Sequence, residues 1–183
     1  MKRLFIASKI DLDSNFTSLY QQLRLQSPFD EISWTESQNL HLTLRFLGKT
    51  PDSQIGNIIH SLNDIFKNYG NIELKLYKIG IFGSRYKPTV IWLGFEDNAL
   101  LTSLFAGVEE ALIEAGFQPN HGNFVPHLTL GRIKKIDNKK WFNERITSLQ
   151  PSFNQKINIK EWSLYQSILT HDGPIYKILH TWK

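Results

Sequence analysis

The segments 41–44 and 127–130 share one pattern of alternating polar and apolar residues, because both read His-Leu-Thr-Leu. Successive side chains of a β-strand point to opposite faces, so each copy places its His and Thr on one face and its two Leu residues on the other. The apolar face predicts an anchor in the core, and the polar face presents an imidazole and a hydroxyl. Two such strands facing one another would form a cleft that holds two histidines and two hydroxyl groups.

The rest of the chain repeats at the offset of 86 residues that separates His41 from His127, which indicates an internal duplication. Apolar residues recur with strand and helix periods in the order strand, helix, strand, helix, strand, and this order occurs twice. Pro51 suits the start of one helix and Gly116 the end of another. Besides the two motif strands, corresponding elements are expected at 2–8 and 88–94, 16–23 and 101–112, 51–69 and 138–149, and 71–79 and 154–163. A further strand is expected at 174–181.

The composition is that of a compact domain. The chain has 183 residues, of which 41% are hydrophobic, so we expect one bilobal unit over 1–183 with duplicated halves at approximately 1–87 and 88–183. No apolar run approaches the length of a membrane span, and the strand-like start is too short for a signal peptide. We therefore expect a cytoplasmic monomer with no membrane partner. The net charge of +4 mildly favours a phosphate-bearing partner.

The available side chains favour acid–base chemistry without a metal. The chain contains no cysteine, which excludes disulfides, thiolate nucleophiles and cysteine-ligated zinc. A metal-dependent hydrolase would need a cluster of His, Asp and Glu residues, and no such cluster adjoins either motif. Two imidazoles can act as acid and base without a metal, because histidine titrates near neutral pH. The other four histidines have no partner at a recognisable spacing and are expected to be structural: His60, His121, His171 and His180.

The residues around the two motifs resemble a known family. The segment 39–48 reads Asn-Leu-His-Leu-Thr-Leu-Arg-Phe-Leu-Gly, and the segment 124–132 reads Phe-Val-Pro-His-Leu-Thr-Leu-Gly-Arg. Together they resemble the paired signatures of the 2H phosphoesterases, and within that superfamily the RNA 2′,3′-cyclic phosphodiesterases, also called 2′-5′ RNA ligases. The resemblance runs nearly end to end. One departure is Gln166, where this branch is expected to have glutamate.

The resemblance implies a fold and a reaction. The implied fold is a bilobal, pseudo-twofold duplicated α+β fold, with an antiparallel sheet in each lobe, helices outside and both His-x-Thr strands in a central cleft. The implied reaction opens the 2′,3′-cyclic phosphate end of an RNA or oligonucleotide to a 2′-phosphate, with no cofactor or metal and with 2′-5′ ligation as a minor activity. The resemblance also implies that His41 is the proton donor and His127 the proton acceptor.

The chemistry of the implied reaction suits this pair of motifs. Attack and departure at phosphorus are in line, so the acid and the base must lie on opposite sides of the phosphate. Thr43 and Thr129 would donate hydroxyl hydrogen bonds to the non-bridging oxygens and stabilise the developing charge. A non-catalytic RNA-binding module is the alternative function, and it would leave the paired His-x-Thr strands without a purpose.

Two arginines adjoin the motifs. Strand alternation places Arg132 off the face of His127, but a bulge near Gly131 would return it, and the resemblance implies that Arg132 binds phosphate. Alternation places Arg45 on the face of His41, where it is either a phosphate contact or a solvated cation at the strand edge.

Aromatic residues and one connecting segment are the remaining candidates for contact with RNA. Phe5 and Trp34 are candidates for base stacking, whereas most other aromatic residues are expected to pack in the core. The segment 82–87 is expected to be a loop between the two halves. Its glycine, basic and aromatic residues suit either contact with RNA or a solvated linker.

Overall fold

The computed structural model describes residues 1–12, 14–25, 30–84, 86–148, 156–171 and 173–183. In chain order the elements are β1 (Lys2–Lys9), α1 (Ser14–Leu25), β2 (Glu31–Trp34), η1 (Ser37–Asn39), β3 (His41–Thr50), η2 (Asp52–Gln54), α2 (Ile55–Tyr69), β4 (Ile72–Ser84), β5 (Lys87–Phe95), α3 (Ala99–Glu114), β6 (His127–Lys135), α4 (Lys139–Ser148), β7 (Lys156–Ile159), β8 (Trp162–Thr170) and β9 (Gly173–Trp182). The strands in this part of the chain pair antiparallel in the order β7-β4-β5-β6-β3-β1-β8-β9, with β2 paired to β6.

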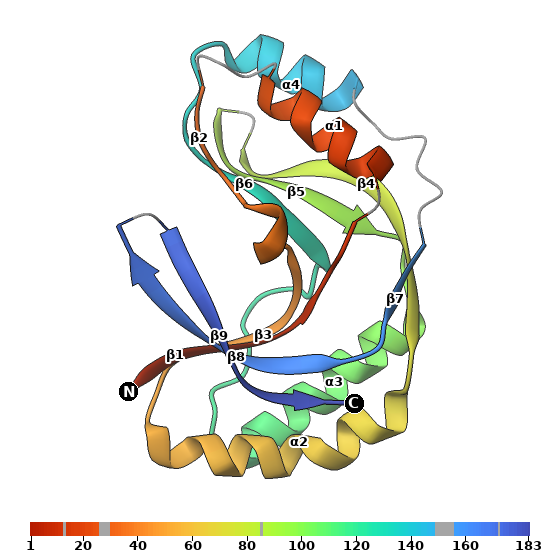
Figure 1. Ribbon diagram of the computed structural model, residues 1–183, viewed down its shortest axis with the longest axis vertical. Helices are drawn as coiled ribbons and strands as arrows, with labels where there is room; N and C mark the ends of the chain where they lie inside the picture. Colours follow the sequence, from red (N-terminus) through yellow and green to blue (C-terminus); the bar gives the residue numbers. More distant parts are fainter. Residues whose placement is uncertain (13, 26–29, 85, 149–155, 172) are drawn as a thin grey trace.

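The sheet curls, and the helices cover it outside at its two ends. Helices α1 and α4 lie together near β2, β6 and β5, and helices α2 and α3 lie together near β3, β8 and β9 (Figure 1). The expected α+β architecture with two lobes and outer helices is confirmed. The strands of the two lobes are continuous with one another, because β6 of one lobe pairs with β3 of the other.

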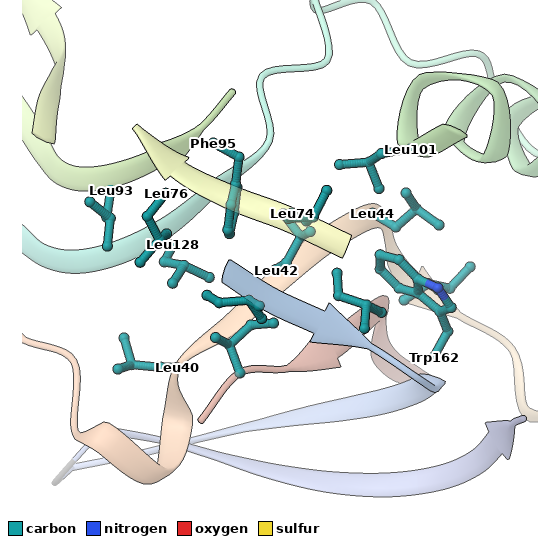
Figure 2. Close-up of a cluster of buried hydrophobic side chains, with 14 of the residues drawn as sticks. Leu40, Leu42, Leu44, Leu74, Leu76, Leu93, Phe95, Leu101, Leu128 and Trp162 are labelled. Carbon is teal, nitrogen blue, oxygen red and sulfur yellow. The ribbon is translucent and has the colours of Figure 1, made fainter. Parts of the chain in front are cut away.

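The two motif strands meet at the middle of the sheet. Leu42 in β3 pairs with Leu128 in β6, and both side chains are fully buried. Figure 2 shows Leu42, Leu44 and Leu128 within one cluster of buried apolar side chains. A slip of one residue would turn these leucines out and the histidines in, so burial of the leucines fixes the register. The alternation expected for both motifs is therefore confirmed.

Helix α3 illustrates how the sequence sets the outer helices. The side chain of Asn98 caps its start by accepting a hydrogen bond from the backbone N–H of Leu101 at 2.9 Å. Gly116 has φ +90°, a conformation that glycine adopts without strain, and the helix ends just before it, as expected. The buried residues of α2 and α3 recur at helical spacing: Ile58, Leu62 and Phe66, and Leu101, Leu104, Val108 and Leu112. No helix in the described ranges has both the length and the apolar character that crossing a membrane requires.

The hairpin β4–β5 replaces the loop expected at 82–87. Its ladder continues to the pair Ser84 and Lys87, and the hydroxyl of Thr89 donates to the carbonyl of Phe82 at 3.0 Å. The prediction of a loop was wrong for Phe82, Gly83, Ser84 and Lys87, which are paired in this ladder, and Arg85 lies outside the described residues. Phe82 therefore has a fixed place on a strand.

Smaller differences concern element boundaries. Strand β2 was not expected, because four residues are too few to show a period, and its pairing with β6 defines it. The strand expected at 154–163 is divided into β7 and β8, and residues 154–155 lie outside the described ranges. The helix expected from Pro51 begins with a 3₁₀ turn before Ile55. The expected helical residue Leu149 lies outside the described residues.

The central pair of leucines can be tested by truncation. We expect Leu42→Ala to lower the free energy of unfolding by about 2–5 kcal/mol, because it opens a cavity where the two lobes join. The measurement is chemical denaturation followed by circular dichroism. Leu169→Ala is the matched control, because Leu169 is 67% exposed, and it should change stability by less than about 0.5 kcal/mol. Equal effects of the two changes would contradict the central role of Leu42.

Candidate active site

The two motif histidines make the same contact with the backbone. Nδ1 of His41 lies 2.6 Å from the carbonyl oxygen of Asn39, and Nδ1 of His127 lies 2.7 Å from the carbonyl oxygen of Val125. A carbonyl oxygen only accepts, so Nδ1 carries the donated proton in both rings. In the neutral rings Nε2 then has the free lone pair, and each ring is oriented to take up or return a proton at Nε2.

The antiparallel register brings the four polar motif residues together. Because Leu42 pairs with Leu128, His41 is carried toward Thr129, and Thr43 toward His127. Thr43 and His127 line one pocket together. The hydroxyls of Thr43 and Thr129 have no hydrogen-bond partner within the described part of the chain, so both are available to a ligand. Each end of the site therefore combines an imidazole from one strand with a hydroxyl from the other.

Burial lowers the pKa of both histidines. For His41, desolvation is the largest cause, the hydrogen bond to Asn39 opposes it, and the charges of His127 and Arg132 lower the pKa further. For His127, desolvation again dominates, the hydrogen bond to Val125 opposes it, and the charge of Arg132 adds to the lowering. The two rings and the Arg132 guanidinium are thus close enough to influence one another. With no ligand, both rings are mostly neutral at pH 7.

Arg132 reaches the site through a bulge. In the ladder of β6 with β5, Gly131 pairs with Ile91 and Thr129 pairs with Trp92, so Leu130 is an extra residue that shifts the alternation. Gly131 consequently faces the packed side, where a Cβ atom would lie 2.8 Å from Ile32 and 3.0 Å from Trp34. The bulge expected near Gly131 is confirmed, and Arg132 is exposed on the side of the histidines.

The Arg45 side chain is held by other groups of the protein. The ladder of β3 with β1 shifts at Leu44, so alternation no longer places Arg45 with His41. Its guanidinium lies 2.5 Å from the carboxylate of Glu109 in α3 and donates to the carbonyl of Gln118 at 2.5 Å. The Arg45 side chain is only 11% exposed, so it is not a solvated cation. Arg45 lines the pocket of His127, but its charge is already paired within the protein.

An aromatic pocket adjoins His41. The imidazole lies 5.1 Å from the ring of Phe5 and 5.1 Å from the ring of Tyr176, and Phe5 stacks on Tyr165. Burial raises the pKa of both tyrosine hydroxyls, which therefore remain protonated at neutral pH. Phe5 lies at the site as expected, with Lys9, Gln38 and Ile178 completing the pocket. Trp34 does not line either pocket, because it packs edge-on against Tyr20.

A second aromatic wall adjoins His127, and the sequence analysis missed it. Phe82 meets the imidazole edge-on at 4.8 Å and stacks on Trp92 at 5.1 Å. The indole of Trp92 lies over two glycines, since a Cβ atom would come within 2.3 Å of the indole at Gly80 and 2.6 Å at Gly94. The glycines at these positions of the paired strands β4 and β5 were the sequence signal that could have indicated a large aromatic side chain lying over them. Phe124, Asn120 and Asn123 complete the pocket of His127.

Within the described ranges, the other histidines and the acidic residues form no second site. His180 packs its ring on Trp182 at 4.9 Å, and none of the four remaining histidines lines either pocket. Among the residues whose positions are described, no group of three or more His, Asp and Glu side chains is arranged to hold a metal ion.

Known proteins resemble this chain in sequence and in fold. The family model described as LigT-like phosphoesterase matches residues 10–92 and again residues 94–176. An RNA 2′,3′-cyclic phosphodiesterase of Methanocaldococcus jannaschii is 34% identical over 180 residues, which cover 98% of this chain and 99% of that protein. One of Methanothermobacter thermautotrophicus is 31% identical over 176 residues, which cover 95% and 94%. The crystal structure of E. coli LigT in apo form has a TM-score of 0.75 at 25% identity and covers 99% of this chain and 96% of that chain.

The electrostatic link between Arg132 and the histidines can be measured by NMR titration of the imidazole resonances. We expect both motif histidines to titrate below their usual pKa of 6.5 in the free protein, because burial and Arg132 disfavour the charged rings. Arg132→Met removes a cation, so it should raise both pKa values. Arg24→Met, which removes an exposed cation paired with Glu36, should leave them unchanged. Histidines that titrate at or above 6.5 in the unmodified protein would contradict this arrangement.

Proposed function

This chain belongs to the LigT-like phosphoesterase family of the 2H phosphoesterases, and on that premise we propose that it hydrolyses RNA 2′,3′-cyclic phosphate ends to 2′-phosphates. The chain is thus a phosphodiesterase that acts on RNA. The observation that carries this proposal is the pairing of the two His-x-Thr strands at Leu42 and Leu128, which brings two imidazoles and two free hydroxyls to one site.

Two proton transfers on opposite sides of phosphorus give the reaction. Nε2 of His127 takes a proton from water as the water oxygen bonds to phosphorus, and the bond from phosphorus to the 3′ oxygen breaks in line. His41, protonated at Nε2, gives its proton to the departing 3′ oxygen. The product is a 2′-phosphomonoester, and the proton gained by His127 returns through solvent to His41 for the next turnover.

The anionic substrate supplies a negative charge that favours protonation of the histidines. Both imidazoles have lowered pKa values, so the free enzyme seldom holds the protonated His41 that the leaving group needs. A phosphodiester between the rings carries a negative charge, and a nearby opposite charge favours the imidazolium. Substrate binding therefore raises the pKa of both rings, and because two charged rings repel, the form with one proton on the pair becomes more populated. In this proposal the reactive form has that proton on His41 and leaves His127 neutral.

The phosphate oxygens have three partners in this proposal. The hydroxyls of Thr43 and Thr129 donate hydrogen bonds to the non-bridging oxygens, one from each motif strand. The bulge in β6 brings Arg132 to the face of the two histidines, and from there its guanidinium neutralises the phosphate charge. Donors fixed on strands before the reaction need no reorganisation as charge develops, which is where such hydrogen bonds contribute most.

The direction of attack assigns the terminal nucleotide to one pocket and the nucleophile to the other. The departing ribose oxygen is on the side of His41, so the terminal nucleotide lies by the pocket with Phe5 and Tyr176. The nucleophile enters from the side of His127. An RNA 5′-hydroxyl in place of water would give a 2′-5′ linkage, but water at about 55 M outcompetes it unless a second RNA is held in position, so ligation is a minor activity.

The remaining features of the proposal concern the whole molecule. We propose that the chain acts in the cytoplasm as a monomer, and that residues 1–183 form one bilobal domain with duplicated halves at approximately 1–87 and 88–183. The two successive matches of one family model support the duplication. The alternative function, a non-catalytic RNA-binding module, gives no role to the two matched imidazoles and does not agree with the phosphodiesterase relatives.

Removal of either imidazole should abolish most of the activity. We expect His41→Ala and His127→Ala each to lower kcat by about 10²–10⁴ on an oligonucleotide with a 2′,3′-cyclic phosphate end, because each loses one proton transfer. His60→Ala is the matched control, because His60 is exposed on α2, and it should retain full activity. A folded His41→Ala or His127→Ala variant with nearly full activity would show that the site lies elsewhere.

The product and the metal requirement can be tested in one assay. After exhaustive treatment with EDTA, the enzyme should still convert the cyclic end, and the product should resist an enzyme that removes 3′-phosphates only. The first expectation follows from acid–base catalysis by two imidazoles, and the second from proton transfer by His41 to the 3′ oxygen. Strict dependence on an added divalent ion would contradict the two-histidine mechanism. Release of phosphate by the 3′-specific enzyme would show that ring opening expels the 2′ oxygen instead.

A further inference from the structure

The segment 117–126 determines how His127 is presented. It joins α3 to β6 without helix or strand and leads directly into His127. The Val125 carbonyl in this segment accepts the Nδ1 proton of His127. Asn120 and Asn123 line the pocket on the same side. A displacement of this segment would change both the orientation of the imidazole and the shape of the pocket from which the nucleophile enters.

An ion pair holds this segment in place. Nε of Arg45 in β3 lies 2.5 Å from the Glu109 carboxylate in α3, and the side chains are only 11% and 13% exposed. The same two side chains hold the segment itself. Arg45 donates to the carbonyl of Gln118 at 2.5 Å, and Glu109 accepts from the backbone N–H of Asn120 at 3.0 Å. The motif strand, the outer helix and the segment before His127 are therefore connected through one pair of charges.

The chemistry of the pair suits a positioning role. An arginine presents several N–H donors in a rigid planar group, so it can contact a carboxylate and a carbonyl at once, which lysine does less well. Exposed ion pairs contribute little, but removing one partner from a pair this far from solvent leaves an uncompensated charge. The segment also contacts α3 through Phe124, which stacks on Phe105 at 4.1 Å. Unlike the ion pair, this stacking fixes no polar group of the backbone.

We propose that Arg45 and Glu109 are positioning residues that hold the segment 117–126 so that Val125 fixes the catalytic tautomer of His127. This inference rests on the proposed function, in which His127 is the base, and it assigns Arg45 to the protein rather than to the phosphate. The base can take a proton from the nucleophile only while Nε2 is the unprotonated nitrogen facing the site. The ion pair thus acts on the reaction through His127.

The experiment compares Arg45→Met, Arg45→Lys and Glu109→Gln in the full chain, with Arg24→Met as a control for loss of an exposed arginine. Ring ¹⁵N shifts report which nitrogen of each histidine carries the proton, and kinetics separate kcat from KM. We expect Arg45→Met and Glu109→Gln to mix the tautomers of His127, to leave those of His41 unchanged, and to lower kcat about tenfold or more with little change in KM. Arg45→Lys should recover part of both losses, and Arg24→Met should change neither.

Other outcomes would overturn the inference. A raised KM with unchanged His127 shifts would make Arg45 a phosphate contact, and a loss of stability with unchanged kcat and shifts would make the pair merely structural. If a single change prevents folding, the double change Arg45→Met/Glu109→Leu removes both charges together, which proteins often tolerate, and the same His127 shift is expected. The NMR result does not depend on activity toward RNA, so failure of the proposed function would be seen separately, in the unmodified enzyme.

Discussion

The pairing of Leu42 with Leu128 is the constraint on which the rest of the site depends. It joins the two lobes through β3 and β6 and buries the apolar face of both motifs. Because strand side chains alternate, burying these leucines forces His41 and His127 onto the opposite face. Because the pairing is antiparallel, each imidazole is directed toward the threonine of the other strand. A single packing contact thus produces a site with approximate twofold symmetry.

The electrostatics of the site favour a neutral resting state. Desolvation lowers the pKa of both imidazoles, and Arg132, which the bulge in β6 returns to their face, lowers them further. The same cation attracts the phosphate whose negative charge reverses the effect on His41. The symmetric rings therefore acquire different roles only when an asymmetric substrate lies between them, with its leaving oxygen toward one and the nucleophile toward the other.

Local patterns made much of this predictable from the sequence. The repeated His-Leu-Thr-Leu gave the motif strands and their buried faces, and the end of α3 was marked by Gly116. What was missed depends on how particular segments pair and pack. The place of Arg45 follows from a shifted ladder with β1 and from Glu109 in α3, neither of which leaves a local signal. Phe82 was missed for a different reason, because the glycine and the basic residues beside it are typical of a loop, whereas its pairing with Val90 in the β4–β5 hairpin places it on a strand.

The most direct test of the two-histidine mechanism changes the leaving atom. A 2′,3′-cyclic substrate with sulfur in place of the 3′ oxygen expels a thiolate, which needs no general acid because a thiol is far more acidic than a ribose hydroxyl. Single-turnover rates on this substrate should be nearly normal for His41→Ala and remain strongly reduced for His127→Ala. Recovery of His127→Ala instead, or of neither variant, would contradict the assignment of the acid to His41 and the base to His127.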